Sequence, residues 1–377
     1  MGVVSAEPLG YHSADASAVT SLPAMSRRSR ALRVAVLGAG TVGAEVVRAL
    51  LERAEELTSV DGAPLTLAGI AVRDVDRARR RGLSPDLLTD APAHLVAAAD
   101  TDVIVELMGG DEPARTLIAA ALGAGKAVVT ANKHVIAHHG PELEALARRT
   151  GASLRFEAAV GGGIPILGPI ATELAGNRIN VVRGIVNGTT NSILTAMADE
   201  GRDYADALAD AQAAGYAEAD PSGDVEGLDA VNKIVILARL AFGVWLDPAD
   251  VSNVPSHGPG AGRPGITGVM ATDVQEARAH GGVIKLIAEA ARRDDDVAPS
   301  ASVLPRILDA DSPMGRTGGV LNRIEVDGIP VGTVAFSGPG AGGPATSSAV
   351  LGDLVAIARE LGSTWAGLPP ALAAVTR

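Results

Sequence analysis

Asp229 and Lys233 stand four residues apart in a stretch whose other residues are mostly apolar. Residues at this spacing share one face of a helix, and an ammonium can donate a proton and stabilise negative charge on an oxygen atom. A solvated surface ion pair is the usual alternative, but apolar neighbours predict a buried surround in which a lone charge would be costly. We expect that surround to comprise Leu228, Val231, Ile234, Val235, Leu237 and Ala238. The pair is therefore the first candidate for proton-transfer chemistry.

Two further charged residues could join this pair. Glu218 lies just upstream, in a loop that Pro221 and Gly223 are expected to bend. Lys133 comes just after the apolar run 127–131. If that run is a strand of a parallel sheet, Lys133 lies at the carboxyl edge of the sheet, where ligands collect.

A phosphate-binding loop is predicted at the sequence Gly38-Ala39-Gly40-Thr41-Val42-Gly43. It fits the G-x-G-x-x-G pattern, directly after the apolar run VAVLG and at the start of an expected helix. The first glycine permits a tight turn, the second lets the backbone approach a pyrophosphate, and the third lets helix pack on strand. Free N–H groups at the helix N-terminus attract the phosphates. The loop predicts dinucleotide binding.

The choice of nicotinamide cofactor depends on Arg73 and Asp74, which follow the second expected strand. A carboxylate at this place favours the ribose 2′-hydroxyl of NAD, whereas a guanidinium can pair with the 2′-phosphate of NADP. Because Arg73 comes first, NADP is favoured and NAD stays possible.

The elements that position these residues alternate from Arg33 onward between short apolar and longer amphipathic runs. This alternation is typical of βα units on a doubly wound, Rossmann-type parallel sheet, an α/β fold with right-handed crossovers. Strands are expected at 33–38, 65–72, 102–108, 127–131 and 152–158, with helices at 42–57, 92–99, 113–123 and 137–149.

A second, α+β domain with a mixed sheet is expected beyond the run Gly161-Gly162-Gly163. Its expected helices are 166–175, 190–200, 204–214 and the one that carries Lys233, and its expected strands are 179–186, 283–291 and a hairpin around Asp327-Gly328. The glycine-rich loop 252–265 is interpreted as a surface connection. A turn at Gly338–Gly343 and a helix at 347–361 end the pattern. The expected division is a disordered tail at 1–30, a dinucleotide-binding domain at 31–158, a catalytic and dimerisation domain at 159–335, and a segment at 336–377 that returns to the first domain.

Composition excludes several classes of function. The net charge of −12 provides no sustained basic face for a nucleic acid. The chain has no cysteine, which excludes thiolate metal sites and catalysis by a cysteine nucleophile. No run of about 18 apolar residues is present to span a membrane, and the first 30 residues lack the continuous apolar core of a secretory signal. We expect a cytoplasmic protein.

Five ordered motifs together resemble the homoserine dehydrogenase family. They are the loop Gly38–Gly43, the sequence TANK at 130–133, FEAAVGGGIPIL at 156–167, GIVNGTTNSIL at 184–194 and GYAEADPSGDVEGLDAVNK at 215–233. The resemblance extends from about residue 32 to the end. It implies interconversion of L-aspartate 4-semialdehyde and L-homoserine with NAD(P)H, on the shared route to threonine, isoleucine and methionine.

The resemblance also implies roles for individual residues. Lys233 is the implied proton donor to the carbonyl oxygen, and Lys133 lies near cofactor and substrate. Glu218 and Asp229 hold the amino end of the substrate, and the turn at Gly342 returns to the cofactor. A sodium ion is implied at Glu157, Val160, Gly162 and Ile164, where a carboxylate and free carbonyls among glycines suit a hard cation.

Physical chemistry supports these roles. Hydride reduction of an aldehyde leaves an alkoxide, which an ammonium at Lys233 can protonate. The substrate α-carboxylate has Lys133 or the N–H groups near Gly188, Thr189 and Thr190 as candidate partners. Because relatives are dimers, a homodimer is expected. Feedback control through a separate regulatory domain is not expected. Two alternatives are a related reductase of another small carbonyl or imine, for which acids facing an amino group make little sense, and a non-catalytic dinucleotide sensor, which needs no proton donor.

Overall fold

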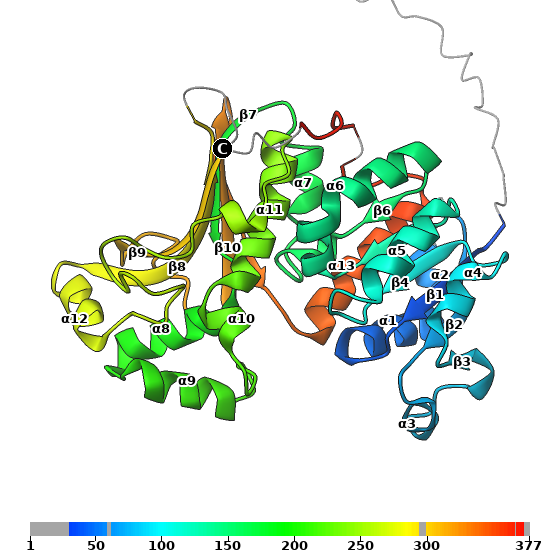
Figure 1. Ribbon diagram of the computed structural model, residues 1–377, viewed down its shortest axis with the longest axis horizontal. Coiled ribbons are helices and arrows are strands. Elements are labelled where there is room, and N and C mark those ends of the chain that lie inside the picture. The colour runs from blue at the N-terminus through cyan, green and yellow to red at the C-terminus, as the bar shows by residue number, and fades with distance from the viewer. Residues whose placement is uncertain (1–29, 59–61, 294–298, 366, 373–377) are drawn as a thin grey trace, which may run out of the picture.

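The computed structural model describes residues 30–58, 62–293, 299–365 and 367–372. The tail expected at 1–30 therefore lies outside the described residues, apart from Arg30. Figure 1 shows two sheets, one on either side of the helices α6 (Lys133–Thr150) and α11 (Leu228–Phe242).

The first sheet has six parallel strands in the order β3-β2-β1-β4-β5-β6. This confirms the predicted doubly wound fold. The strands are β1 (Leu32–Leu37), β2 (Leu65–Ala71), β3 (Leu88–Thr89), β4 (Val103–Glu106), β5 (Ala127–Thr130) and β6 (Leu154–Arg155). All four residues of β4 are buried, as expected for a central strand covered on both faces.

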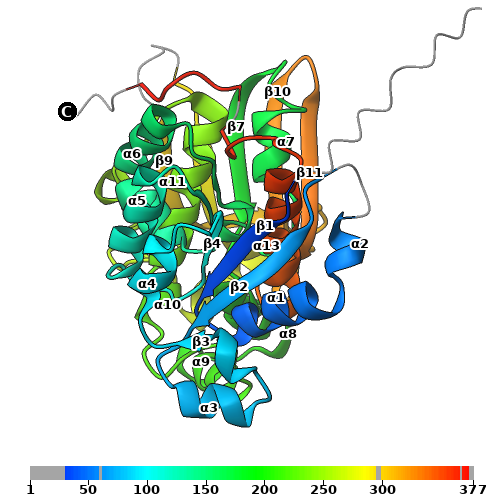
Figure 2. The ribbon, with the colours of Figure 1, turned by 90° about the vertical axis from the view of Figure 1, so that its right-hand side faces the viewer.

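Helices cover both faces of this sheet (Figure 2). On one face, α5 (Ala114–Gly123) packs against α6, and on the other α1 (Thr41–Glu52) packs against α13 (Gly343–Ala358). The smaller helices of this part are α2 (Ala54–Thr58), α3 (Val75–Arg80), η1 (Pro85–Leu87) and α4 (Pro92–Ala97). Because α13 follows the second sheet in sequence, the chain returns to the first sheet before it ends.

The second sheet has five strands in the order β11-β10-β7-β8-β9, and every ladder in it is antiparallel. The expectation of a mixed sheet was therefore wrong. The strands are β7 (Arg178–Ile185), β8 (Gly282–Ala291), β9 (Ser300–Asp309), β10 (Leu321–Ile329) and β11 (Gly332–Pro339). Asp327 and Gly328 lie inside β10, so the predicted hairpin is present but turns later, before Gly332, whose φ of 73° is left-handed.

Helices line the face of this sheet that points toward the first domain, and others extend from its end. They are α7 (Leu167–Ala171), α8 (Gly188–Glu200), α9 (Tyr204–Ala213), α10 (Ser222–Val225), α11 and α12 (Ala271–Ala279), with the short turns η2 (Glu157–Ala159) and η3 (Pro248–Asp250). The loop expected at 252–265 contains no helix or extended strand.

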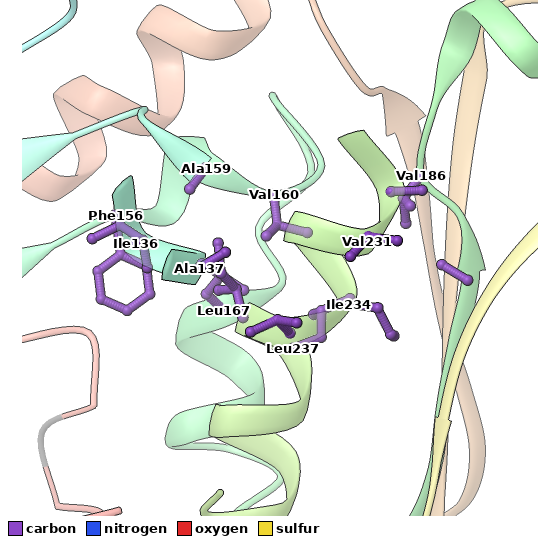
Figure 3. Close-up of a cluster of buried hydrophobic side chains, with 14 of the residues drawn as sticks. Ile136, Ala137, Phe156, Ala159, Val160, Leu167, Val186, Val231, Ile234 and Leu237 are labelled. Carbon is purple, nitrogen blue, oxygen red and sulfur yellow. The ribbon is translucent and has the colours of Figure 1, made fainter. Parts of the chain in front are cut away.

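One hydrophobic core joins the two halves of the molecule. Helix α11 packs on β7, β8 and β9 and also on α6. Figure 3 shows the apolar side chains at this junction, where Val231, Ile234 and Leu237 of α11 lie in one cluster with Ile136 of α6 and Leu167 of α7. The first residues of α6 and α11 are thereby held close together.

Candidate active site

Asp229 and Lys233 form a buried ion pair in the first two turns of α11. Their side chains are each 9% exposed, and Lys233 Nζ lies 2.7 Å from Asp229 Oδ2. Lys233 Nζ also donates to the carbonyl of Val186, at 2.6 Å, just beyond β7. The predicted apolar surround is buried except for Leu228, the first residue of the helix, which is 46% exposed.

Lys133 approaches the same carboxylate from the other domain. It is the first residue of α6, which Asn132 caps by accepting the N–H of Val135. Lys133 Nζ lies 2.6 Å from Asp229 Oδ1, and its side chain is 41% exposed. Asp229 thus holds one ammonium group on each oxygen, one buried and one open to solvent. We call Lys133, Asp229 and Lys233 the catalytic cluster.

The environment shifts the pKa of each member of the cluster. Burial lowers the pKa of Lys233, and Lys133 lowers it further, against the opposing effect of Asp229. The Asp229 carboxylate raises the pKa of Lys133, which is the less buried lysine. Burial alone would raise the pKa of Asp229, but the two ammonium groups outweigh burial and hold that pKa below its ordinary value. Lys233 is therefore a stronger acid than an ordinary lysine.

Asn187 and Asp224 also belong to this site, and neither was predicted to do so. Asn187 Nδ2 donates to Asp224 Oδ1 at 2.7 Å and to Asp229 Oδ2 at 2.8 Å. Its Oδ1 accepts the N–H of Thr190, so Asn187 caps α8 while it orients Asp229. Asn187 could have been found from its place directly before Gly188 and two threonines, because asparagine is a preferred N-cap residue.

The α8 N-terminus offers free donors beside the cluster. Among the described residues, the N–H groups of Gly188 and Thr189 have no backbone or side-chain acceptor, whereas that of Thr190 is taken by Asn187. Of the three N–H groups predicted to be available to an α-carboxylate, two are thus unengaged.

Glu218 lies apart from the cluster. Its side chain is exposed, and its backbone carbonyl accepts a hydrogen bond from Gln212 Nε2 at 2.9 Å. No hydrogen bond or ion pair connects it with Asp229 in the described part of the chain. The second acid that the structure places beside Asp229 is Asp224, because α10 and the N-terminus of α11 turn Asp224, and not Glu218, toward Asn187.

The phosphate loop has the geometry that a pyrophosphate requires. Gly38 has a φ of 102°, and a Cβ there would lie 2.6 Å from the carbonyl of Leu107. A Cβ at Gly43 would lie 1.9 Å from the carbonyl of Gly38, so only glycine allows this packing of helix on strand. A Cβ at Gly40 would have no heavy atom within 4 Å. Gly40 caps α1 without a side chain, which leaves the N–H groups of Thr41 and Val42 open to a ligand.

Arg73 and Asp74 differ in their surroundings beyond β2. Both are exposed, but the Asp74 carboxylate accepts the N–H of Arg77 at 2.8 Å and caps α3. Arg73 has no ion pair or side-chain hydrogen bond within the described ranges. The guanidinium is thus free for a phosphate, whereas the carboxylate already has a structural role.

The chain from Gly338 to Gly343, which we call the 338–343 turn, connects β11 with α13 at the mouth of the phosphate loop. A Cβ at Gly343 would lie 3.1 Å from Thr41 Cγ2. Gly342 has a φ of 107° and caps α13. At the other end of the turn, the carbonyl of Pro339 accepts the N–H of Gly163 at 3.1 Å. Gly342 is therefore next to the predicted cofactor site.

The predicted sodium ligands surround the turn after β6. The carboxylate of Glu157 accepts the N–H groups of Ile166, Leu167 and Gly168 at 2.7, 2.8 and 2.8 Å. Burial raises the pKa of Glu157, against these three donors. The carboxylate therefore already holds the start of α7 in place, and a nearby cation would stabilise its charged form.

Carbonyl groups of the same turn are the other predicted ligands. In the part of the chain that the structure describes, the carbonyls of Val160, Gly162 and Ile164 accept no hydrogen bond. Carbonyl and carboxylate oxygens are the ligand types that a hard cation takes. No group of three or more histidine, aspartate or glutamate side chains that could hold a metal occurs among the described residues.

Within the described ranges, none of the helices is both long and apolar enough to cross a membrane.

Two family models match consecutive parts of the chain. The model described as homoserine dehydrogenase, NAD binding domain, matches residues 38–157, and the model described as homoserine dehydrogenase matches residues 165–355.

Curated relatives match most of the chain. A homoserine dehydrogenase of Corynebacterium glutamicum is 44% identical over 350 residues, which cover 90% of this chain and 76% of that protein. A homoserine dehydrogenase of Bacillus subtilis is 39% identical over 332 residues, covering 88% and 74% of the two chains.

Solved structures agree with these relatives. A homoserine dehydrogenase from Thiobacillus denitrificans superposes with a TM-score of 0.83 at 36% identity, covering 91% of this chain and 79% of that one. A hyperthermophilic archaeal homoserine dehydrogenase, determined in complex with NADPH, superposes with a TM-score of 0.70 at 29% identity, covering 86% and 97%.

Proposed function

The chain belongs to the homoserine dehydrogenase family, and on that premise we propose how its catalytic cluster interconverts L-aspartate 4-semialdehyde and L-homoserine. Members of this family are oxidoreductases that act on a CH–OH group. Neither of the two alternatives, another carbonyl or imine reductase and a non-catalytic sensor, is favoured by the matches over both halves of the chain. The observation that carries the mechanism is the single carboxylate, Asp229, held between a buried and an exposed lysine.

Lys233 is the proposed proton donor to the carbonyl oxygen. The nicotinamide, when bound, supplies the hydride. Lys233 Nζ has two fixed acceptors, Asp229 Oδ2 and the carbonyl of Val186, so its third proton is available to the substrate. Because burial lowers the pKa of Lys233, the ammonium transfers its proton more readily than an exposed lysine would. In the reverse direction, the neutral amine accepts the proton of the homoserine hydroxyl.

Substrate binding is proposed to use the charges around the cluster. Asp229 and Asp224, together with the predicted Glu218, provide negative charge for the α-ammonium of the substrate. The N–H groups of Gly188 and Thr189 at the α8 N-terminus suit its α-carboxylate, since a helix N-terminus binds anions. Lys133 is exposed enough to contact the same carboxylate while it stays near Asp229.

The cofactor is a nicotinamide dinucleotide, and we propose a preference for NADP. Support comes from Arg73, whose guanidinium has no partner among the described residues, and from Asp74, whose carboxylate is already used to cap α3. The archaeal relative determined in complex with NADPH is consistent with this preference.

Three further properties stay proposals. A sodium ion would be held by the carboxylate of Glu157 and the carbonyls of Val160, Gly162 and Ile164, and it would keep the turn before α7 in place.

A homodimer is supported by exposed apolar residues at the margin of the second sheet, among them Ile307, Leu321 and Ile329. Light scattering of the purified protein would test it. The proposed setting is the cytoplasmic route to threonine, isoleucine and methionine.

A spectrophotometric assay tests the proposed function. Purified protein should oxidise NADPH or NADH on addition of L-aspartate 4-semialdehyde, and should reduce NADP or NAD on addition of L-homoserine. Absence of turnover in both directions with both cofactors would contradict the proposal.

A further inference from the structure

Asn322 on β10 is a buried amide without a partner. The residue is 1% exposed, and neither Nδ2 nor Oδ1 has a hydrogen bond. The other unpaired buried side-chain atoms in the described part of the protein are single guanidinium nitrogens of Arg33, Arg115 and Arg239, and each of these arginines forms an ion pair through another guanidinium nitrogen. Leaving a whole amide unpaired in the interior costs free energy, and such a group in a native protein calls for a physical explanation.

The 338–343 turn packs against this amide. A Cβ at Gly340 would lie 2.0 Å from Asn322 Nδ2 and 2.5 Å from Oδ1, so the backbone of the turn rests directly on the amide. A Cβ at Gly162 would in turn lie 2.6 Å from the carbonyl of Gly340. Gly340 has no side chain, so the part of the turn that contacts the Asn322 amide is backbone. Peptide groups of the turn are therefore the partners that could reach the amide with the smallest movement of the turn.

The far end of the same turn touches the phosphate loop, where Gly343 packs against Thr41. Asn322 is also close to the catalytic cluster. The next residue of β10, Arg323, pairs with Ile185, the last residue of β7. Val186, which follows Ile185, accepts the hydrogen bond from Lys233. Asn322 therefore lies between the cluster and the turn that leads to the cofactor.

We propose that Asn322 is a positioning residue for dinucleotide binding, and that its amide pairs with peptide groups of the 338–343 turn when that turn settles against the bound dinucleotide. An amide offers both donors and an acceptor, which match the carbonyl and N–H groups of a backbone turn. The unpaired amide makes the free protein less stable, and pairing in the bound form favours the dinucleotide complex by linkage. The proposal rests on the dinucleotide as cofactor and not on the identity of the carbonyl substrate.

The test compares Asn322→Leu with the unaltered protein. Leucine has nearly the shape of asparagine and no polar atoms, so replacing an unpaired amide should leave the melting temperature of the free protein equal or higher. NADPH titration without substrate should show a dissociation constant raised about tenfold, which corresponds to about 1.4 kcal/mol. Asn180→Leu, a half-buried asparagine on β7 away from the turn, is the matched control and should bind NADPH as the unaltered protein does.

Two results would overturn the proposal. One is an Asn322→Leu protein that binds NADPH within twofold of the unaltered protein. The other is a lower melting temperature without dinucleotide, which would show that the amide already has a partner in the free protein. Failure of Asn322→Leu to fold counts as the second result, unless Asn322→Ala, which removes the amide and adds no bulk, folds and binds NADPH more than twofold more weakly than the unaltered protein. A protein that binds NADPH but does not reduce L-aspartate 4-semialdehyde contradicts the proposed function and leaves this test intact.

Discussion

At the scale of single residues, Asp229 organises the site because it accepts from three side chains at once. Lys133, Lys233 and Asn187 come from α6, α11 and the start of α8, and each contacts one of its two oxygens. The sequence predicted the two lysines and Asp229. It could not show that Asn187 and Asp224 join them, because their side chains meet only after β7 and α10 are packed. For the same reason it could not show that Glu218 lies outside the cluster in the free protein.

Arg73 is the residue on which the predicted cofactor preference depends. Arg73→Ala should raise the KM for NADPH and leave the KM for NADH nearly unchanged, because only NADPH carries the 2′-phosphate that the guanidinium would bind. Steady-state kinetics with each cofactor measures this. Arg77→Ala, also exposed and in the following helix, is the control. An equal change in both KM values would show that Arg73 does not contact the 2′-phosphate.

At the scale of elements, the βα alternation predicted the first sheet well because its strands are buried on both faces and separated by amphipathic helices. The misses have local causes. β9 contains Pro305, which weakens a strand prediction but is tolerated on an edge strand. The strand expected at 152–158 is interrupted because the chain forms η2, which places Glu157 beneath α7. Helix α6 begins at Lys133, earlier than the hydrophobic pattern indicated, because Asn132 caps it.

The relative position of α6 and α11 depends on Glu144. Its carboxylate, 3% exposed, accepts from Arg239 Nε at 2.9 Å, from Arg239 Nη2 at 2.7 Å and from Trp245 Nε1 at 2.8 Å. Burial would raise the pKa of Glu144, but these donors outweigh it and keep that pKa low. The contact joins the helix that begins with Lys133 to the helix that carries Lys233.

Glu144→Gln should lower the free energy of unfolding by about 3–5 kcal/mol, because it leaves the buried guanidinium of Arg239 without its counter-charge. Urea unfolding measures the change. Glu142→Gln is the control on the same helix: its ion pair with Arg115 is exposed, and its loss should cost no more than about 1 kcal/mol. Equal losses in the two variants would contradict the structural role of Glu144.

At the scale of the whole molecule, one core spans both domains, so the stability of either half is coupled to the other. Lys285 on β8 is 2% exposed, and it donates to the carbonyl of Thr317 at 2.8 Å and to Asn191 Oδ1 at 3.0 Å. Burial lowers its pKa from 10.5 to about 8. The folded state therefore releases a proton from Lys285 at a lower pH than the unfolded state does.

The sign of the pH effect follows from proton binding. Between about pH 8 and pH 10.5 the unfolded state binds more protons at this residue, so its contribution to stability rises with pH across that window. The difference in pKa corresponds to about 3 kcal/mol. Lys285→Met removes the titrating group. The measured quantity is the free energy of unfolding of the unaltered protein minus that of the variant. This difference should increase by about 3 kcal/mol from pH 7.5 to pH 10.5. A difference that stays constant would show that the pKa of Lys285 is not lowered in the folded protein.

The central claim is that Lys233, buried against Asp229, protonates the oxygen that hydride transfer leaves negative. Lys233→Met keeps the length of the side chain and removes the ammonium. The direct measurement is kcat for NADPH-dependent reduction of L-aspartate 4-semialdehyde, together with the dissociation constant for NADPH, with Lys126→Met as a control outside the cluster. We predict a loss of kcat by a factor on the order of 10² to 10⁴ in Lys233→Met, with a modest change in NADPH affinity. A variant that retains near-normal kcat would contradict the claim.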